Sequence, residues 1–141
     1  GSSLVGSEMC IRDRYTASGL TPDGSSTYFL AKHVGLLRAK ELFLTNKMLS
    51  ADEAKQWGFV TEVIAHDNLT TKARELARQF ANGPTKAYGG VKRMLLSSFS
   101  SPIESQLDNE TRHIVGTMDT HDGPHGLNAF LNKEKPRFTG S

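Results

Sequence analysis

Few residues in this sequence have the types and spacing that catalysis or metal binding requires. The five histidines include one i, i+4 pair, His121 and His125, but the Gly-Pro step between them argues against a shared helical face. No carboxylate or cysteine completes a set of metal ligands around this pair. No glycine-rich phosphate loop is present, and no Ser-His-Asp arrangement follows from spacing alone. The sequence therefore predicts no metal site and leaves one acid as the candidate for chemistry.

That acid is Asp23, which follows Pro22 and precedes Gly24 in a stretch rich in glycine and serine. Such a composition predicts a loop. The alternative to a chemical role is a turn aspartate whose carboxylate bonds its own backbone. The local pattern alone favours this structural role, so a catalytic role for Asp23 needs further support.

The composition is that of an ordinary globular domain. The chain has 141 residues, of which 37% are hydrophobic and 23% are charged, and its formal net charge is +2. The basic residues are spread along the chain, so the clustered basic face of a nucleic-acid-binding protein is not expected. The densest basic group, Lys86, Lys92 and Arg93, is explained as well by a solvated helix face as by a ligand.

The sequence carries no signal for membranes or secretion. No apolar run approaches the ~18 residues that a membrane helix needs, and no charged region followed by an apolar stretch indicates a secretory signal. Cys10 is the only cysteine, which excludes an internal disulfide and agrees with a reducing compartment. We therefore expect a cytoplasmic protein that binds neither membranes nor nucleic acids.

The first fourteen residues, GSSLVGSEMCIRDR, show neither the helical nor the strand period of apolar residues. They resemble translated sequencing-adapter read-through at the broken end of a gene fragment. We expect residues 1–14 to be non-native and exclude them from the fold prediction. The alternative is a native flexible tail.

Helical patterns begin after the loop that holds the candidate acid. Ser26 or Thr27 is predicted to cap a short helix through Leu30. A longer helix is predicted from Val34, because its apolar residues recur at i, i+3 and i+7 spacing, and Asn46 is expected to end it.

A short capped helix and a strand come next, followed by four more helices. Ser50 and Glu53 form a capping box, and Gly58 is expected to end that helix in the left-handed conformation. Residues 59–64, FVTEVI, predict a strand. Short helices cover one another only partly, so some of their apolar surface is expected to face further protein. The remaining predicted helices are one ending near Asn82, one starting at Pro84, one starting near Pro102 and broken at residues 122–124, and a last one ended by Pro136.

Several motifs spread over residues 15–141 carry a family resemblance. They are the loop GLTPDGSST (19–27), the stretch LSADEA (49–54), the run WGFV (57–60), GPT (83–85) with Lys92, and the ending from Gly126 to Gly140. Together they resemble the crotonase family of enoyl-CoA hydratases and isomerases.

The resemblance implies an α/β crotonase-like fold, a spiral of ββα units followed by helices that trimerise. In this chain, which is mostly α, the end of the core and the C-terminal helices are expected. Residues 15–66 are then the C-terminal part of the crotonase core, and residues 67–141 are a helical trimerisation subdomain. The expected assembly is a homotrimer or a dimer of trimers.

The resemblance also implies a chemistry. Crotonases bind acyl-CoA thioesters, and two backbone N–H groups hold the thioester oxygen as it becomes an enolate. Side-chain acids then move protons at neighbouring carbons. Both N–H groups are expected upstream of residue 15, so the isolated chain is expected to be inactive. No separate cofactor is implied, because coenzyme A is part of the substrate.

Asp23 matches the acid of the family's isomerases, whereas its hydratases carry a glutamate eight residues earlier, at the position of Tyr15. A phenol, with an ordinary pKa of about 10, is a poor base for activating water. The resemblance therefore favours double-bond isomerisation, with Asp23 as the catalytic residue and Tyr15 in the substrate site. The alternatives are an enoyl-CoA hydratase, an aryl-CoA dehalogenase with Asp23 as nucleophile, and a non-catalytic helical oligomerisation module.

Phe130 and Lys133 match family positions that contact the adenine and the phosphates of coenzyme A, often from the neighbouring subunit. Both are therefore predicted to bind substrate. The alternative is that Phe130 belongs to the core and Lys133 is merely solvated.

Overall fold

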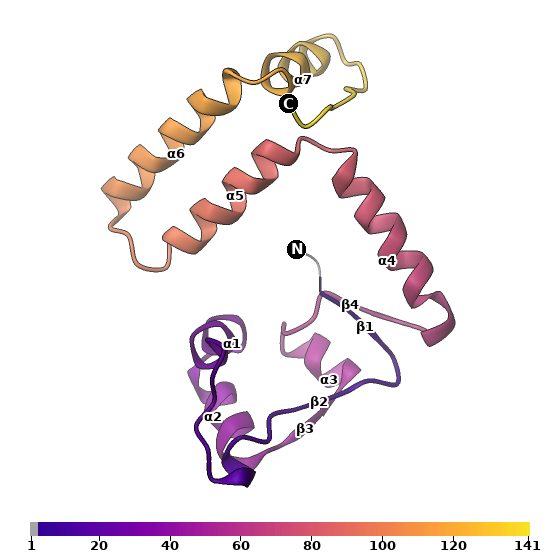
Figure 1. The fold of residues 1–141 in the computed structure, drawn as a ribbon, viewed down its shortest axis with the longest axis vertical. Helices are drawn as coiled ribbons and strands as arrows, with labels where there is room; N and C mark the ends of the chain where they lie inside the picture. The colour runs from indigo at the N-terminus through magenta and orange to yellow at the C-terminus, as the bar shows by residue number, and fades with distance from the viewer. Residues whose placement is uncertain (1–2) are drawn as a thin grey trace. The chain divides into compact units, whose positions relative to one another are not determined.

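The computed structural model describes residues 3–141, which divide into two compact units that meet within one helix. The first unit extends to Ala73 and the second runs from Arg74 to Ser141. The described residues form seven α-helices, one short 3-10 helix and four strands of three residues each (Figure 1). Helix α4 (His66–Ala81) begins in the first unit and ends in the second.

Four short strands pair within the first unit. Strand β1 (Leu4–Gly6) runs parallel to β4 (Glu62–Ile64), and β2 (Cys10–Arg12) runs antiparallel to β3 (Met48–Ser50). Neither strand of residues 3–12 was predicted, because residues 1–14 were excluded from the fold prediction as non-native. The non-native origin of residues 1–14 stays a prediction, and Gly1 and Ser2 lie outside the described residues.

Both helices predicted for this part of the first unit are present, but the first extends past Leu30 to Val34, and the second begins at Leu36 rather than at Val34. Helix α1 (Ser26–Val34) and helix α2 (Leu36–Thr45) are separated by a single glycine. Asn46 ends α2 with a φ of 53°, as predicted, since asparagine tolerates the left-handed conformation. Helix α3 (Ala51–Gln56) follows β3 directly.

The capping box at the start of α3 is confirmed in both directions. The Glu53 amide donates to Ser50 Oγ at 3.2 Å, and the Ser50 amide donates to Glu53 Oε2 at 3.0 Å. These bonds hold the pKa of Glu53 below its ordinary value, first through the Ser50 backbone and then through its side chain. Gly58 has a φ of 78°, which confirms the predicted left-handed residue after the helix.

The core of the first unit lies between α2, β3 and α3. Leu49 of β3 is fully buried, and Leu42 of α2 packs against it with Ala54 and Val60. Full burial of a leucine side chain contributes about 1.5–3 kcal/mol. The partly buried side chains around this cluster are Val5, Ile11, Leu30, Trp57, Phe59 and Val63.

The second unit is built on a helix hairpin. Helix α5 (Thr85–Ser97) and helix α6 (Ile103–Met118) run side by side in opposite directions, and α7 (Asp122–Leu131) follows (Figure 1). Gly90 of α5 faces His113 of α6, and a Cβ at this position would make an ordinary contact of 3.4 Å with Cδ2 of His113.

A buried glutamine connects α5 and α6 next to the turn between them. Gln106 Nε2 donates to the carbonyl of Met94 at 3.1 Å, and its Oε1 accepts from Ser97 Oγ at 3.0 Å. Both partners belong to α5, so the amide joins α6 to it. A buried amide is tolerated because its donor and acceptor are both satisfied.

Most large apolar side chains of the second unit are exposed. Among its described residues only Ala129 is a buried hydrophobic residue. This agrees with the expectation that the short helices cover one another only partly; trimerisation through this surface stays a prediction. The exposed side chains of α5, α6 and α7 are Val91, Leu95, Leu96, Ile103, Leu107, Ile114, Val115, Met118, Leu127, Phe130 and Leu131.

The predicted strand at residues 59–64 is shorter than expected, because strand pairing begins only at Glu62. The amides of Phe59 and Val60 instead donate to the carbonyl of Ala54, at 2.9 Å and 3.3 Å, and so complete the end of α3. Amides that donate to the end of a helix are not available for hydrogen bonds between strands.

Two predicted helix boundaries are wrong. Residues 122–124 were predicted to break the helix that starts near Pro102, but they form the first turn of α7. Pro124 is tolerated there because it removes only an amide that has no intrahelical partner. Helix α1 is preceded by Ser25 with a φ of 63° and has no side-chain cap. The Ser26 hydroxyl, predicted as a cap, donates backward to the Asp23 carbonyl at 2.8 Å.

Candidate functional site

The structure brings together two of the predicted site residues, Tyr15 and Asp23. The phenol Oη of Tyr15 donates to Oδ1 of Asp23 at 2.5 Å. This hydrogen bond, followed by the negative charge of Asp23, raises the pKa of Tyr15 above its ordinary value. Both side chains are exposed, so a ligand can reach the carboxylate.

The loop around Asp23 is shaped by its backbone rather than by its carboxylate. Gly24 and Ser25 adopt φ values of 60° and 63°, and the Ser26 amide donates to the Asp23 carbonyl at 3.1 Å. Within the part of the chain that the structure describes, the carboxylate accepts from Tyr15 and not from its own backbone. The turn aspartate that local pattern favoured is therefore wrong.

The side chain of Asn46 binds the two residues that follow Tyr15. Its Oδ1 accepts from the amide of Ala17 at 3.2 Å, and its Nδ2 donates to Oγ1 of Thr16 at 2.9 Å. These residues form the 3-10 helix η1 (Thr16–Ser18), which directly follows Tyr15. Sequence reasoning assigned Asn46 only to the end of α2 and missed this second role, because its partners lie about thirty residues away.

An apolar pocket of about 310 Å³ lies in the same unit. Phe29 and Leu30 of α1, together with Leu42 and Phe43 of α2, form much of its wall. Asp23 is not among the lining residues; the nearest lining residue in sequence is Ser26, which binds the Asp23 carbonyl. The size suits a small apolar group. The other lining residues are Ile11, Arg12, Asp13 and Phe59.

Phe130 and Lys133 lie at the end of α7 in the second unit. The Phe130 ring is 77% exposed, so the alternative that it belongs to a core is wrong for this chain. Lys133 adopts a φ of 58°, and its amide donates to the Phe130 carbonyl at 3.1 Å. An exposed ring and an exposed cation joined by one turn can contact an aromatic base and a phosphate.

Sequence reasoning missed the role of Asp122, a buried acid whose carboxylate accepts several hydrogen bonds. Its carboxylate is 5% exposed and accepts from the amides of Thr139 at 2.9 Å and Gly140 at 2.7 Å. Burial raises the pKa of Asp122, but the hydrogen bonds from these amides, His121 and the Thr139 hydroxyl lower it to about 2. The bonds hold the end of the chain beside the start of α7.

The prediction that His121 and His125 do not share a helical face is wrong. Their rings stack with centroids 5.6 Å apart, and the His125 amide donates to the His121 carbonyl at 3.4 Å. The intervening Gly-Pro step fits because it lies in the first turn of α7. Within residues 3–141 no group of three metal-ligating side chains comes together, and no helix is long and apolar enough to cross a membrane.

Comparison with known proteins gives a consistent result. The family model for enoyl-CoA hydratase/isomerase matches residues 7–141. The chain is 34% identical over 126 residues to 1,2-epoxyphenylacetyl-CoA isomerase of Escherichia coli K12, covering 89% of this chain and 48% of that protein. It is also 34% identical over 116 residues to 4-chlorobenzoyl coenzyme A dehalogenase-1 of an Arthrobacter species, covering 82% and 42%.

Solved structures agree with the predicted fold. A putative enoyl-CoA hydratase/isomerase from Mycobacterium abscessus superposes with a TM-score of 0.92 at 29% identity, covering 98% of this chain and 53% of that one. An enoyl-CoA hydratase subunit I from Geobacillus kaustophilus HTA426 gives 0.93 at 28% identity, covering 98% and 54%. These similarities confirm the crotonase-like fold, and the chain spans about half the length of the curated relatives it matches.

Proposed function

The chain belongs to the enoyl-CoA hydratase/isomerase family, and from that premise we propose that it supplies the acid of an acyl-CoA double-bond isomerase. Asp23 removes a proton from one carbon of the acyl chain, an enolate forms at the thioester, and Asp23 returns the proton to a different carbon. The observation that carries this proposal is the 2.5 Å hydrogen bond from Tyr15 to Asp23.

That hydrogen bond suits proton transfer for two reasons. A phenol that donates to a carboxylate orients it and stabilises its ionised form, which is the form that accepts a proton. The same bond raises the pKa of Tyr15, so the phenol stays protonated at neutral pH and does not act as a base toward water. The second acid that a hydratase would use to activate water is thus replaced by a donor, which favours isomerisation over hydration.

Substitution of Asp23 in the complete protein that contains this chain tests the proposal. We expect Asp23→Asn to lower kcat for an enoyl-CoA isomerisation by about 10²–10⁴ with little change in KM, because a general acid–base contributes that much. Asp67→Asn, at an exposed acid of α4, is the matched control and should leave kcat unchanged. Full activity of the Asp23→Asn enzyme would overturn the proposal.

A second candidate is aryl-CoA dehalogenation, which the 34% identity to a 4-chlorobenzoyl coenzyme A dehalogenase favours. In that reaction an Asp23 oxygen bonds to the ring carbon, chloride leaves, and water then cleaves the aryl ester. Mass spectrometry of the enzyme quenched during turnover of 4-chlorobenzoyl-CoA distinguishes the two candidates. An aryl-CoA adduct on Asp23 supports dehalogenation, whereas an absence of adduct and of chloride release with 4-chlorobenzoyl-CoA, together with turnover of an enoyl-CoA, supports isomerisation.

The remaining features of the proposal follow the family. The protein needs no separate cofactor, since coenzyme A belongs to the substrate, and it works as a cytoplasmic homotrimer or dimer of trimers. Phe130 and Lys133 contact the adenine and phosphates of the substrate; the exposure of the Phe130 ring supports this role. We expect Lys133→Ala to raise KM for an acyl-CoA about tenfold while leaving kcat nearly unchanged, because it removes one charge-assisted contact.

A further inference from the structure

We propose that the hairpin of α5 and α6 carries a second binding site, a cleft that takes a small anion bearing phosphate or diphosphate. The cleft has a volume of about 500 Å³, which lies within the range of about 300–1,000 Å³ that small-molecule sites occupy. All of its lining residues belong to the second unit, and Asp23 is not among them. The inference therefore stands independently of the proposed isomerisation.

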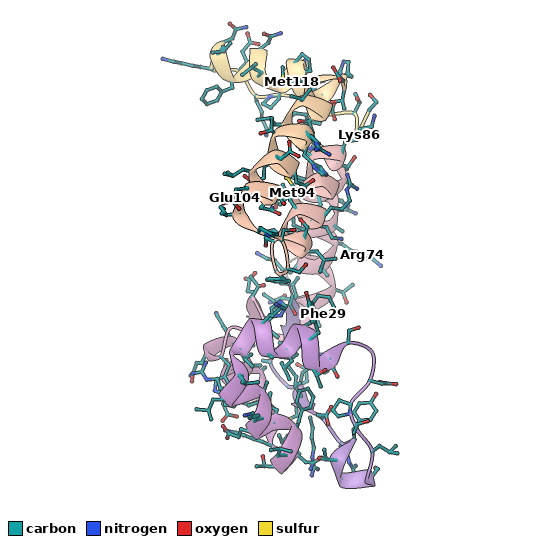
Figure 2. All side chains as sticks on the ribbon, turned by 90° about the vertical axis from the view of Figure 1, so that its left-hand side faces the viewer. Phe29, Arg74, Lys86, Met94, Glu104 and Met118 are labelled. Carbon is teal, nitrogen blue, oxygen red and sulfur yellow. The ribbon has the colours of Figure 1, made fainter. Side chains whose placement is uncertain are left out.

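Three cationic side chains line the cleft from both helices. Lys86 and Arg93 come from α5, and Arg112 comes from α6, whereas no aspartate or glutamate is among the lining residues. Figure 2 shows Lys86 at the end of the hairpin where Met118 lies, away from Glu104. Like charges that converge on one cleft repel one another unless an anion lies between them.

These cations have donors to spare. Among the ion pairs of residues 3–141, none involves Lys86 or Arg93. Arg112 donates to Asp108 through one nitrogen only, and a guanidinium carries five N–H donors. His113 also lines the cleft, and its Nδ1 donates to the Asn109 carbonyl.

Two glycines hold the cleft open. A Cβ at Gly116 would meet no atom within 4 Å, and one at Gly89 would meet only Nη1 of Arg93 at 3.6 Å. Close packing of the helices therefore requires glycine at neither position. Glycine within a helix lowers stability relative to alanine. The two residues thus keep volume free between the cations at the expense of helix stability.

The chemistry of the cations favours phosphate as the ligand. A guanidinium presents a planar fork of donors that matches two phosphate oxygens, and an ammonium adds a point charge. Arg93 and Arg112 stand on opposite helices, so an anion with several charged oxygens satisfies both better than a single carboxylate does. The diphosphate of a coenzyme A ester and that of another phosphorylated compound share this chemistry.

Calorimetric titration of the chain with inorganic pyrophosphate tests the site. We expect saturable binding that Arg93→Gln and Arg112→Gln each weaken at least about tenfold, since each removes a charge-assisted hydrogen bond. Arg78→Gln, at an exposed arginine of α4, is the matched control and should bind like the unaltered chain. No saturable binding, or an equal loss in the control, would overturn the proposal.

Gly116→Leu separates loss of the site from loss of the fold. Position 116 faces open space, and leucine is a better helix former than glycine. The variant should therefore melt at the same or a higher temperature without ligand, yet lose pyrophosphate binding. Retained binding by this variant contradicts the assignment. A parallel titration with coenzyme A identifies the source of the phosphate. If Arg93→Gln weakens the binding of coenzyme A as much as that of pyrophosphate, the ligand is the substrate's own diphosphate. Otherwise the ligand is a different phosphate compound.

Discussion

The carboxylate of Asp122 accepts a hydrogen bond from the amide of Gly140, with Oδ2 and the nitrogen 2.7 Å apart. This contact fastens the end of the chain to the first residue of α7. Thr139 adds its amide and hydroxyl, at 2.9 Å and 3.0 Å from Oδ1. Hydrogen bonds to an ionised acceptor are roughly twice as strong as neutral ones. The closed segment includes Lys133, so Asp122 also restrains a predicted substrate contact.

Acid should release this segment. The pKa of Asp122 is about 2 in the folded chain, below the ordinary 3.8, so its stabilising effect is present above the ordinary value and is lost as pH falls from 3.8 toward 2. We expect the carboxyl carbon of Asp122 to titrate near pH 2 by NMR. In Asp122→Asn, protection of the Gly140 amide should fall about tenfold at neutral pH. A midpoint at or above 3.8 contradicts the model of a hydrogen-bonded carboxylate.

The pairing of Tyr15 with Asp23 predicts an unusual phenol titration. The hydrogen bond to Asp23 and then its charge raise the pKa of Tyr15, so Asp23→Asn should return it toward the ordinary value. Ultraviolet absorbance against pH measures this in a chain whose other two tyrosines, Tyr28 and Tyr88, are replaced by phenylalanine. The control Asp67→Asn should not move the curve. An unchanged curve in Asp23→Asn means that the 2.5 Å contact does not persist in solution.

Features that depend on adjacent residues were predictable from the sequence. The capping box of Ser50 and Glu53, the end of α2 at Asn46 and the left-handed Gly58 each involve groups within four residues of one another. The backbone there has few alternatives, because unsatisfied amides and carbonyls at a helix end must find a nearby partner. The helices of the second unit were found for the same reason, from their local apolar period.

Features that join distant segments were not predictable. Asp122 meets Thr139 seventeen residues later, and Leu4 pairs with Glu62, so no local pattern reports either contact. The contact of Tyr15 with Asp23 was not predicted: the family resemblance only assigned both residues to the site, and the seven residues between them fix no geometry by themselves. Tertiary contacts decide such arrangements, and they also explain why the exposed carboxylate of Asp23 was mistaken for a turn residue on local grounds.

Truncation of Leu49 tests the core of the first unit. This side chain is fully buried against Leu42, Ala54 and Val60, so Leu49→Ala removes apolar contacts and leaves a cavity. We expect the free energy of unfolding to fall by about 2–5 kcal/mol. Leu37→Ala is the matched control, because that side chain is 82% exposed and should change stability by less than about 0.5 kcal/mol. Equal effects of the two substitutions in urea denaturation would show that Leu49 is not buried.

Removal of the cap at Ser50 tests how α3 begins. Ser50→Ala deletes the hydroxyl that accepts from the Glu53 amide at 3.2 Å and leaves that amide without its partner. We expect a loss of about 1 kcal/mol in the free energy of unfolding. The Ser50 amide can still donate to Glu53 Oε2, so the pKa of Glu53 should rise only part of the way to its ordinary value. Ser100→Ala, in the turn after α5, replaces an exposed serine without a capping role and should leave stability unchanged. If both variants unfold at the same urea concentration as the unaltered chain, the capping box contributes nothing to the stability of α3.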